Sequence, residues 1–92
     1  MVVMGDLNAG PDSAPLKLLK QHLSNSREFA GWITGPEGTW NGFDPSVVSD
    51  VVLDYILVRG MNVHSNSHYL QMTSEGRHLS DHLAVGASLE FQ

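Results

Sequence analysis

The alternation of apolar and polar residues predicts four strands along the chain. Residues 2–4 are apolar and run directly into a glycine-containing segment, as a buried strand does where a loop begins. Residues 51–58 carry apolar side chains on both faces, which indicates a sheet that is covered on both sides. Residues 83–91 alternate cleanly, and residues 63–70 form a weaker, more polar strand. The pattern therefore favours sheets and helices packed in layers.

One helix is predicted after the first strand. Asp12 and Ser13 are residue types that commonly cap the start of a helix. Leucines then recur at the spacing of one helical face, at Leu16, Leu19 and Leu23. We expect a helix of about three turns whose leucine face packs into the core.

The segment from residue 25 to residue 49 is predicted to be rich in loops. Its glycines and prolines interrupt any long helix or strand. Within it, the residues Thr39 to Phe43 could form a short strand. So much irregular chain in a small domain is typical of either a functional rim or a disordered insert.

The size of the chain limits it to one small domain. It has 92 residues, of which 41% are hydrophobic and 16% charged, so the core is expected to be thin. Cysteine is absent, and neither a disulfide nor a thiolate metal site can compensate for that core.

Charge and hydropathy exclude several classes of function. The formal net charge is −5, which disfavours a protein that coats polyanions, although a local nucleic-acid site stays compatible with it. No apolar stretch approaches the roughly 20 residues of a membrane span, and no signal segment is visible. We therefore expect a cytoplasmic location.

Polar side chains interrupt the apolar pattern at three strand ends. Asp6 and Asn8 follow the first strand, Asp54 lies within the central strand, and Asp81 and His82 precede the last one. Buried polar groups without partners are costly, so they usually occur in clusters that satisfy one another. Strand ends of a layered sheet can meet at one rim. Carboxylates, an amide and an imidazole without cysteine suit Mg²⁺ or Mn²⁺ better than structural zinc.

Each of these interruptions also has a simpler interpretation. The residues from Gly5 to Asn8 could form a turn in which the asparagine caps its own backbone. Ser80 and its two neighbours could cap the entry of a strand. Asp54 could be a buried acid paired with Arg59 or Arg77. The three interruptions together, in this order, favour a common site over three coincidences.

Four segments together resemble the C-terminal motifs of the endonuclease/exonuclease/phosphatase superfamily. This superfamily includes pancreatic deoxyribonuclease, abasic-site endonucleases, sphingomyelinases, inositol polyphosphate phosphatases and deadenylases. The resemblance extends from residue 2 to about residue 91, and the motif around His82 with its preceding Asp-Tyr strand is quite specific. The segments that carry it are Gly5-Asp6-Leu7-Asn8, Thr39-Trp40-Asn41-Gly42-Phe43, Leu53-Asp54-Tyr55-Ile56-Leu57-Val58 and Ser80-Asp81-His82-Leu83-Ala84-Val85.

The resemblance implies an α+β fold that is half of a four-layer α/β/β/α sandwich with mainly antiparallel strands. Residues 1–92 would form the C-terminal half of such a domain. The other half normally supplies an asparagine, a metal-binding glutamate and a second histidine. None of the four glutamates has that sequence context; they are Glu28, Glu37, Glu75 and Glu90. We therefore expect little activity from this chain alone, with the missing N-terminal half or a second copy completing the fold.

The resemblance also implies a metal-dependent hydrolase of phosphodiester or phosphomonoester bonds, either a phosphoesterase or a nuclease. Asp6 would orient the attacking water and help to hold Mg²⁺ or Mn²⁺, and Asp81 would face the metal. Asn8 would bind the scissile phosphate. His82 would stabilise the developing charge or manage a proton, and Asp54 would orient its ring.

Other residues receive weaker assignments. Trp40 and Asn41 are candidate substrate contacts, although packing explains Trp40 equally well. The substrate stays open among nucleic acid, phospholipid and small phosphoesters. His64 and His68 are expected to face solvent, and His78 to lie on a solvated loop. The alternative function is a non-catalytic binding or scaffold module, or a self-associating half-domain that retains the fold.

Overall fold

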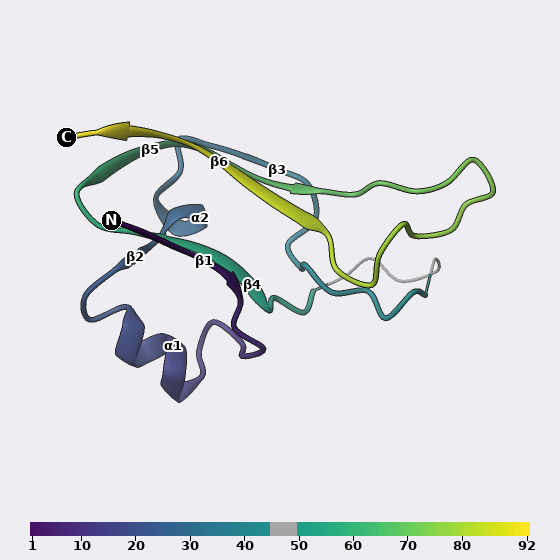
Figure 1. Cartoon of the computed structure of the whole chain (residues 1–92), viewed down its shortest axis with the longest axis horizontal. Helices are drawn as coiled ribbons and strands as arrows, with labels where there is room; N and C mark the ends of the chain where they lie inside the picture. The colour runs from purple at the N-terminus through teal and green to yellow at the C-terminus, as the bar shows by residue number, and fades with distance from the viewer. Residues whose placement is uncertain (45–49) are drawn as a thin grey trace.

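The computed structural model describes residues 1–44 and 50–92, and this part of the chain forms two three-stranded sheets (Figure 1). The first sheet has the order β1-β4-β2 and the second has the order β3-β5-β6. Only β3 and β5 pair in parallel; the other strand pairs are antiparallel. The elements are β1 (Val2–Asp6), α1 (Ala14–Leu19), β2 (Ser24–Asn25), α2 (Ser26–Phe29), β3 (Trp32–Thr34), β4 (Asp54–Val58), β5 (Met61–Tyr69) and β6 (Ala84–Phe91).

The two sheets lie in separate layers, and α1 lies on the outer side of the β1-β4-β2 sheet (Figure 1). The short helix α2 contacts both β4 and β5, so it connects the two sheets. This arrangement confirms the expected α+β fold with mainly antiparallel strands. Every helix in the described part of the chain is too short to cross a membrane.

The central strand β4 supplies most of the core, as its apolar pattern predicted. Tyr55 and Leu57 are buried against Leu16 and Leu23 from the α1 region. The alternate residues of β4 are also buried and point to the other side of the sheet, where β6 lies. Both faces of β4 are therefore covered, which explains why its polar residue Asp54 needs partners.

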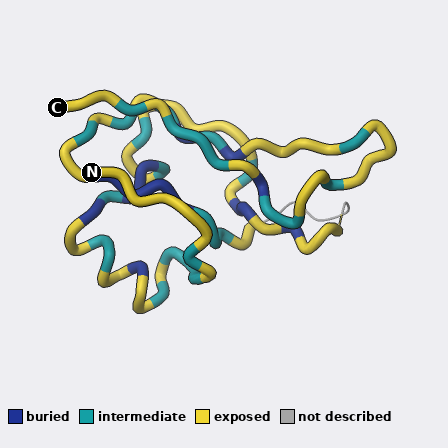
Figure 2. The backbone as a smooth tube through the Cα atoms, viewed as in Figure 1, coloured by how far each residue is buried: buried dark blue, intermediate teal, exposed yellow. Residues whose placement is uncertain are grey.

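The prediction that residues 2–4 are buried was wrong. They do form β1, but Val2 is 41% exposed and Met4 is 70% exposed (Figure 2). The reason is that β1 is the edge strand of its sheet and pairs only with β4 among the described residues. Hydrophobic pattern alone identified the strand and could not identify what covers it.

Three further predictions about secondary structure need correction. The helix α1 ends at Leu19, and the chain continues in a turn that still buries Leu23. The segment from Thr39 to Phe43 is no strand; Trp40 instead makes isolated bridges to Val51 and His82. Residues 25–44 contain β2, α2 and β3 rather than loop alone, and residues 45–49 lie outside the described part.

The prediction that His68 faces solvent was also wrong, because a buried polar cluster occupies this part of β5. His68 is 3% exposed, and its Nδ1 lies 2.8 Å from the carbonyl oxygen of Pro36. Asn66 is 1% exposed, donates to the Ser26 hydroxyl at 2.8 Å and accepts from the Arg27 guanidinium at 3.1 Å. The polar face of β5 thus packs against α2 and the segment after β3, not against water.

Candidate functional site

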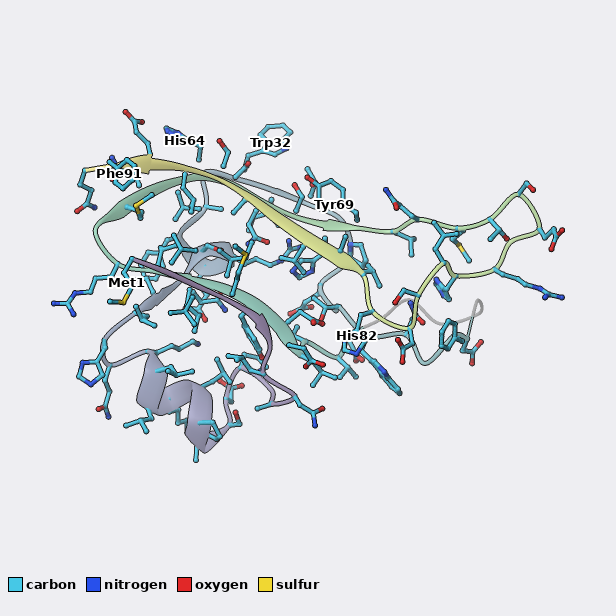
Figure 3. All side chains as sticks on the ribbon, viewed as in Figure 1. Met1, Trp32, His64, Tyr69, His82 and Phe91 are labelled. Carbon is cyan, nitrogen blue, oxygen red and sulfur yellow. The ribbon has the colours of Figure 1, made fainter. Side chains whose placement is uncertain are left out.

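The structure brings three of the expected residues together at one rim of the sheets. One side-chain ligand atom from each of Asp6, Asp54 and His82 lies within 4.8 Å of the others. The register of β1 on β4 places Asp6 directly opposite Asp54. His82 comes from the segment that leads into β6 and lies at the same rim (Figure 3). We call these three residues the acid–histidine cluster.

Asp54 and His82 form the tightest contact of the cluster. The Nδ1 atom of His82 lies 2.7 Å from Oδ2 of Asp54, so the ring donates its Nδ1 proton to the carboxylate. This hydrogen bond raises the pKa of His82, and the charges of Asp54, Asp6 and Asp81 act in the same direction. The side chain of His82 is 29% exposed and that of Asp54 is 16% exposed, so solvent still reaches the pair.

The other ring nitrogen of His82 faces Asp6. Its Nε2 lies 3.7 Å from Oδ2 of Asp6, whose side chain is 48% exposed. The second oxygen of Asp6 accepts a hydrogen bond of 2.8 Å from the backbone N–H of Asn8. The segment therefore forms a turn, as its simpler interpretation expected, but the capping oxygen belongs to Asp6 and not to the asparagine. Asn8 itself is exposed beside Asp6. The site roles of Asp6 and Asn8 stay predictions.

Asn41 holds the backbone next to His82 through two hydrogen bonds. It is 5% exposed, and its side-chain amide donates to the carbonyl oxygen of Ser80 at 3.0 Å. Its backbone N–H donates to the carbonyl oxygen of Asp81 at 2.8 Å. Asn41 thus holds the main chain of the two residues before His82, while the side chain of Trp40 is 39% exposed.

Asp81 is half-buried and lies outside the cluster. Its charge nevertheless contributes to the raised pKa of His82. The expected metal pair was Asp6 with Asp81, whereas Asp54 and His82 are the residues that accompany Asp6 here. The metal-facing role of Asp81 stays a prediction.

Sequence reasoning missed Thr39 as a residue of this site. It is fully buried and makes hydrogen bonds to the backbone next to both Asp54 and His82. A threonine within a glycine-rich loop carries no signal of its own. The only available clue was its position directly before Trp40 in a recognised motif.

A cavity of about 330 Å³ opens beside His82. Its walls include Asn41, Tyr69 and His78, the last of which was expected on a solvated loop. His78 is half-buried, and its Nε2 lies 3.0 Å from the carbonyl oxygen of Asp44. The cavity has the size of a small-molecule site and combines aromatic, amide and imidazole groups.

The donor atoms of the cluster partly fit a metal ion. Two carboxylates suit Mg²⁺ or Mn²⁺, but one oxygen of Asp54 is already engaged with His82. The exposed carboxylate of Asp6 is therefore the group best placed to reach a cation. Among the described residues no glutamate joins the cluster; Glu28 pairs with Lys20, and Glu90 pairs with His64.

Comparisons with known proteins identify a family and similar folds for this chain. The Endonuclease/Exonuclease/phosphatase family matches residues 1–82 of the chain. A functionally unknown conserved protein from Enterococcus faecalis is similar in structure, with a TM-score of 0.88 and 26% identity over 99% of this chain and 36% of its own. An endonuclease/exonuclease/phosphatase family protein from Bacteroides thetaiotaomicron has a TM-score of 0.87, with 24% identity over 99% of this chain and 36% of its own.

A mannosyl-6-phosphatase from the same Bacteroides species has a TM-score of 0.83 and 24% identity, over 98% of this chain and 37% of its own. At these identities the likeness to the two Bacteroides proteins concerns the fold. The chain spans about a third of the length of these solved structures. Among curated proteins none matches it.

Proposed function

The chain belongs to the endonuclease/exonuclease/phosphatase family, and we propose that it carries part of the site of a metal-dependent phosphoesterase. The reaction would be hydrolysis of a phosphodiester or phosphomonoester bond. The observation that carries the proposal is the hydrogen bond of 2.7 Å between His82 and Asp54, with Asp6 on the other side of the imidazole ring. A scaffold module would have no use for three titratable groups at one rim.

Each residue of the cluster has a separate role in this proposal. Asp54 holds the His82 ring with its Nδ1 proton inward, so that Nε2 is the atom offered to substrate. Because Asp54 also raises the pKa of His82, the imidazole gains cationic character that stabilises charge on a phosphate. Asp6 orients the attacking water, and the exposed amide of Asn8 binds the phosphate beside it.

Mg²⁺ or Mn²⁺ would supply charge neutralisation and activate water when bound. Asp6 is the residue that would hold it, and Asp81 is the second carboxylate proposed to face it. The family is generally metal-dependent, and the acid–histidine cluster contains donors that could hold a cation.

We propose a small phosphoester as the substrate class to test first. The similar fold of the mannosyl-6-phosphatase and the cavity of about 330 Å³ beside His82 both favour it. The net charge of −5 disfavours unspecific binding of nucleic acid. Nucleic acid and phospholipid are the other substrates that the assay includes. Asn41, which lines that cavity, and Trp40, which is exposed at the rim, are proposed as substrate contacts.

We also propose that further polypeptide covers the exposed strand β1. Its apolar residues Val2, Val3 and Met4 are all at least 38% exposed, and the chain spans only about a third of its structural neighbours. The covering element would be the other part of a family domain, with a second copy of this chain as the alternative. Size-exclusion chromatography with light scattering separates the two, since only the second gives a dimer.

The experiment uses the chain alone and a chimera in which it replaces the matching part of the Bacteroides thetaiotaomicron mannosyl-6-phosphatase. Hydrolysis of p-nitrophenyl phosphate and bis-p-nitrophenyl phosphate is measured with Mn²⁺, with Mg²⁺ and with a chelator. We expect little activity from the chain alone and clear metal-dependent activity from the chimera. His82→Ala should lower the rate of the chimera by about 10²–10⁴-fold, the usual contribution of a positioned acid or base.

His64→Ala is the matched control, because His64 is exposed on β5 and pairs with Glu90 far along the sheet. It should leave the rate unchanged. A chimera that is folded by circular dichroism and yet hydrolyses neither ester with either metal would contradict the proposal. So would a folded His82→Ala chimera with the full rate.

A further inference from the structure

A single buried residue, Thr39, contacts the backbone of both halves of the Asp54–His82 pair. Its side-chain oxygen accepts hydrogen bonds from the backbone N–H of Leu53 at 2.9 Å and of Asp54 at 3.1 Å. Its carbonyl oxygen accepts from the backbone N–H of Leu83, next to His82, at 2.7 Å. Thr39 is 0% exposed.

We propose that Thr39 is a positioning residue that sets the geometry of the Asp54–His82 pair by holding the main chain beside each partner. The two partners come from β4 and from the segment before β6, which are in different sheets. Within residues 1–44 and 50–92, no strand of one sheet pairs with a strand of the other to fix their separation. The segment that contains Thr39 is what bridges them, through Trp40 to Val51 on one side and to His82 on the other.

The start of this bridging segment is anchored to the buried polar cluster on β5. The Arg27 guanidinium donates to the carbonyl oxygens of Gly35 at 3.3 Å and Pro36 at 3.2 Å. The His68 ring lies 2.8 Å from the same Pro36 oxygen. Gly35 has φ +84°, and a Cβ on it would lie 1.7 Å from the His68 carbonyl oxygen, so only glycine allows this approach. Residues 35–41 are thus fixed at both ends.

The hydroxyl is the part of Thr39 that matters for this role. One oxygen with two lone pairs accepts both N–H groups at the start of β4, which valine of the same shape could not do. Serine keeps the oxygen and loses only a methyl group. Thr39→Val should therefore disturb the pair more than Thr39→Ser, because the hydroxyl and not the size of the side chain makes the hydrogen bonds.

The inference rests on the proposed function only in treating Asp54 and His82 as the reacting pair. The experiment therefore measures the hydrogen bond between Asp54 and His82 directly and does not measure hydrolysis. The measurement is NMR of the metal-free chain with a chelator present. In the wild-type chain we expect a resolved downfield resonance from the hydrogen-bonded Nδ1 proton of His82. We also expect slow solvent exchange at the amides of Leu53, Asp54 and Leu83.

Thr39→Val is expected to abolish the Nδ1 resonance and to speed exchange at Leu53 and Asp54 by about tenfold, as loss of one or two hydrogen bonds would. Thr39→Ser should retain both signals. Thr34→Val is the matched control, because it also removes a threonine hydroxyl. That hydroxyl lies at the surface, where it donates to the Ser67 hydroxyl over 2.7 Å. Amides of β5 and β6 report in each variant that the second sheet is intact.

A folded Thr39→Val variant with an unchanged Nδ1 resonance overturns the proposal. So does a folded Thr39→Ser variant that loses it, because the hydroxyl would then not be the determinant. If Thr39→Val fails to fold, the wild-type chain still decides the point: exchange at Leu53 and Asp54 as fast as at exposed amides contradicts the hydrogen bonds to Thr39. If the chimera shows no hydrolysis, each of these NMR outcomes can still be interpreted, because none of them depends on activity.

Discussion

His82 at the rim and His68 between the sheets make hydrogen bonds of similar length, but their pKa values shift in opposite directions. His82 lies 2.7 Å from a carboxylate, and that contact raises its pKa. His68 lies 2.8 Å from a backbone carbonyl, and burial lowers its pKa despite that bond. For His82 the hydrogen bond to a charged partner outweighs burial, whereas for His68 burial outweighs the hydrogen bond to a neutral carbonyl. The charge of the partner and the burial of the ring together set the direction of the pKa shift.

The largest expected effect tests the carboxylate half of this comparison. Asp54→Asn in the chimera keeps the shape of the side chain and removes its charge, so the His82 ring loses its fixed proton position. We expect the rate to fall by about 10²–10⁴-fold. Asp50→Asn, at an exposed position near the same strand, should have no effect. Equal rates for the two variants in a steady-state assay would remove Asp54 from the site.

The next effect tests the loop that His68 holds. Gly35→Ala places a methyl carbon against the His68 carbonyl oxygen, and the distance between the two atoms would be only 1.7 Å. We expect a loss of about 3 kcal/mol or more in the free energy of unfolding, measured with urea. Gly60→Ala is the matched control, since Gly60 has φ +73° but no atom within 4 Å of the added Cβ. Its cost should be about 1–2 kcal/mol, from backbone conformation alone.

A smaller effect tests the polar cluster that surrounds His68. Asn66→Ala leaves the buried Ser26 hydroxyl without its donor and the Arg27 guanidinium without one acceptor. We expect a loss of about 2 kcal/mol by the same urea measurement. Asn62→Ala, exposed on the same strand, should change stability by less than about 0.5 kcal/mol. Similar values for both would mean that the cluster contributes nothing specific.

The smallest effect is the pH dependence of stability. The pKa of His82 is raised on folding, so its contribution is fully present below about pH 6.5 and is lost as pH rises through the folded pKa. The pKa of His68 is lowered, so its contribution is present above about pH 6.5 and is lost as pH falls through the folded pKa.

Unfolding of the metal-free chain, followed from pH 5 to pH 8, measures both contributions. His82→Gln should remove the decline on the alkaline side, and His68→Gln the decline on the acidic side. Each difference should stay below about 1 kcal/mol, since the His82 pair remains partly solvated. If His82→Gln instead removed the decline of stability on the acidic side, or His68→Gln the decline on the alkaline side, the assignment of the two histidines would be reversed.

The sequence predicted the residues of the rim better than it predicted their surroundings. The apolar runs located β1, β4, β5 and β6, and the polar interruptions named Asp6, Asp54 and His82. The structure places these three side chains together, and they were recognisable because a charged side chain within an apolar strand is a strong local signal. The family resemblance is confirmed over residues 1–82, and the chemistry that it implies for those residues stays a prediction.

The sequence could not predict contacts that depend on how the two sheets meet. His68 alternates with polar neighbours as a surface residue would, yet α2 and the segment around Pro36 cover it. Val2 and Met4 have the composition of a core strand, yet β1 lies at an edge. Thr39 became recognisable only when its hydrogen bonds to β4 were seen. Burial of this kind is a property of tertiary packing, not of local pattern.

The origin of the cluster from three distant parts of the chain has a consequence for folding kinetics. Asp54 and His82 are 28 residues apart, and Asp6 reaches Asp54 only through the pairing of β1 with β4. Closing such loops costs entropy before any contact repays it, so no short fragment can preorganise the cluster. Chains dominated by non-local strand pairing fold on the order of milliseconds to seconds. Recovery of the His82–Asp54 contact after dilution from urea is therefore expected on that time scale.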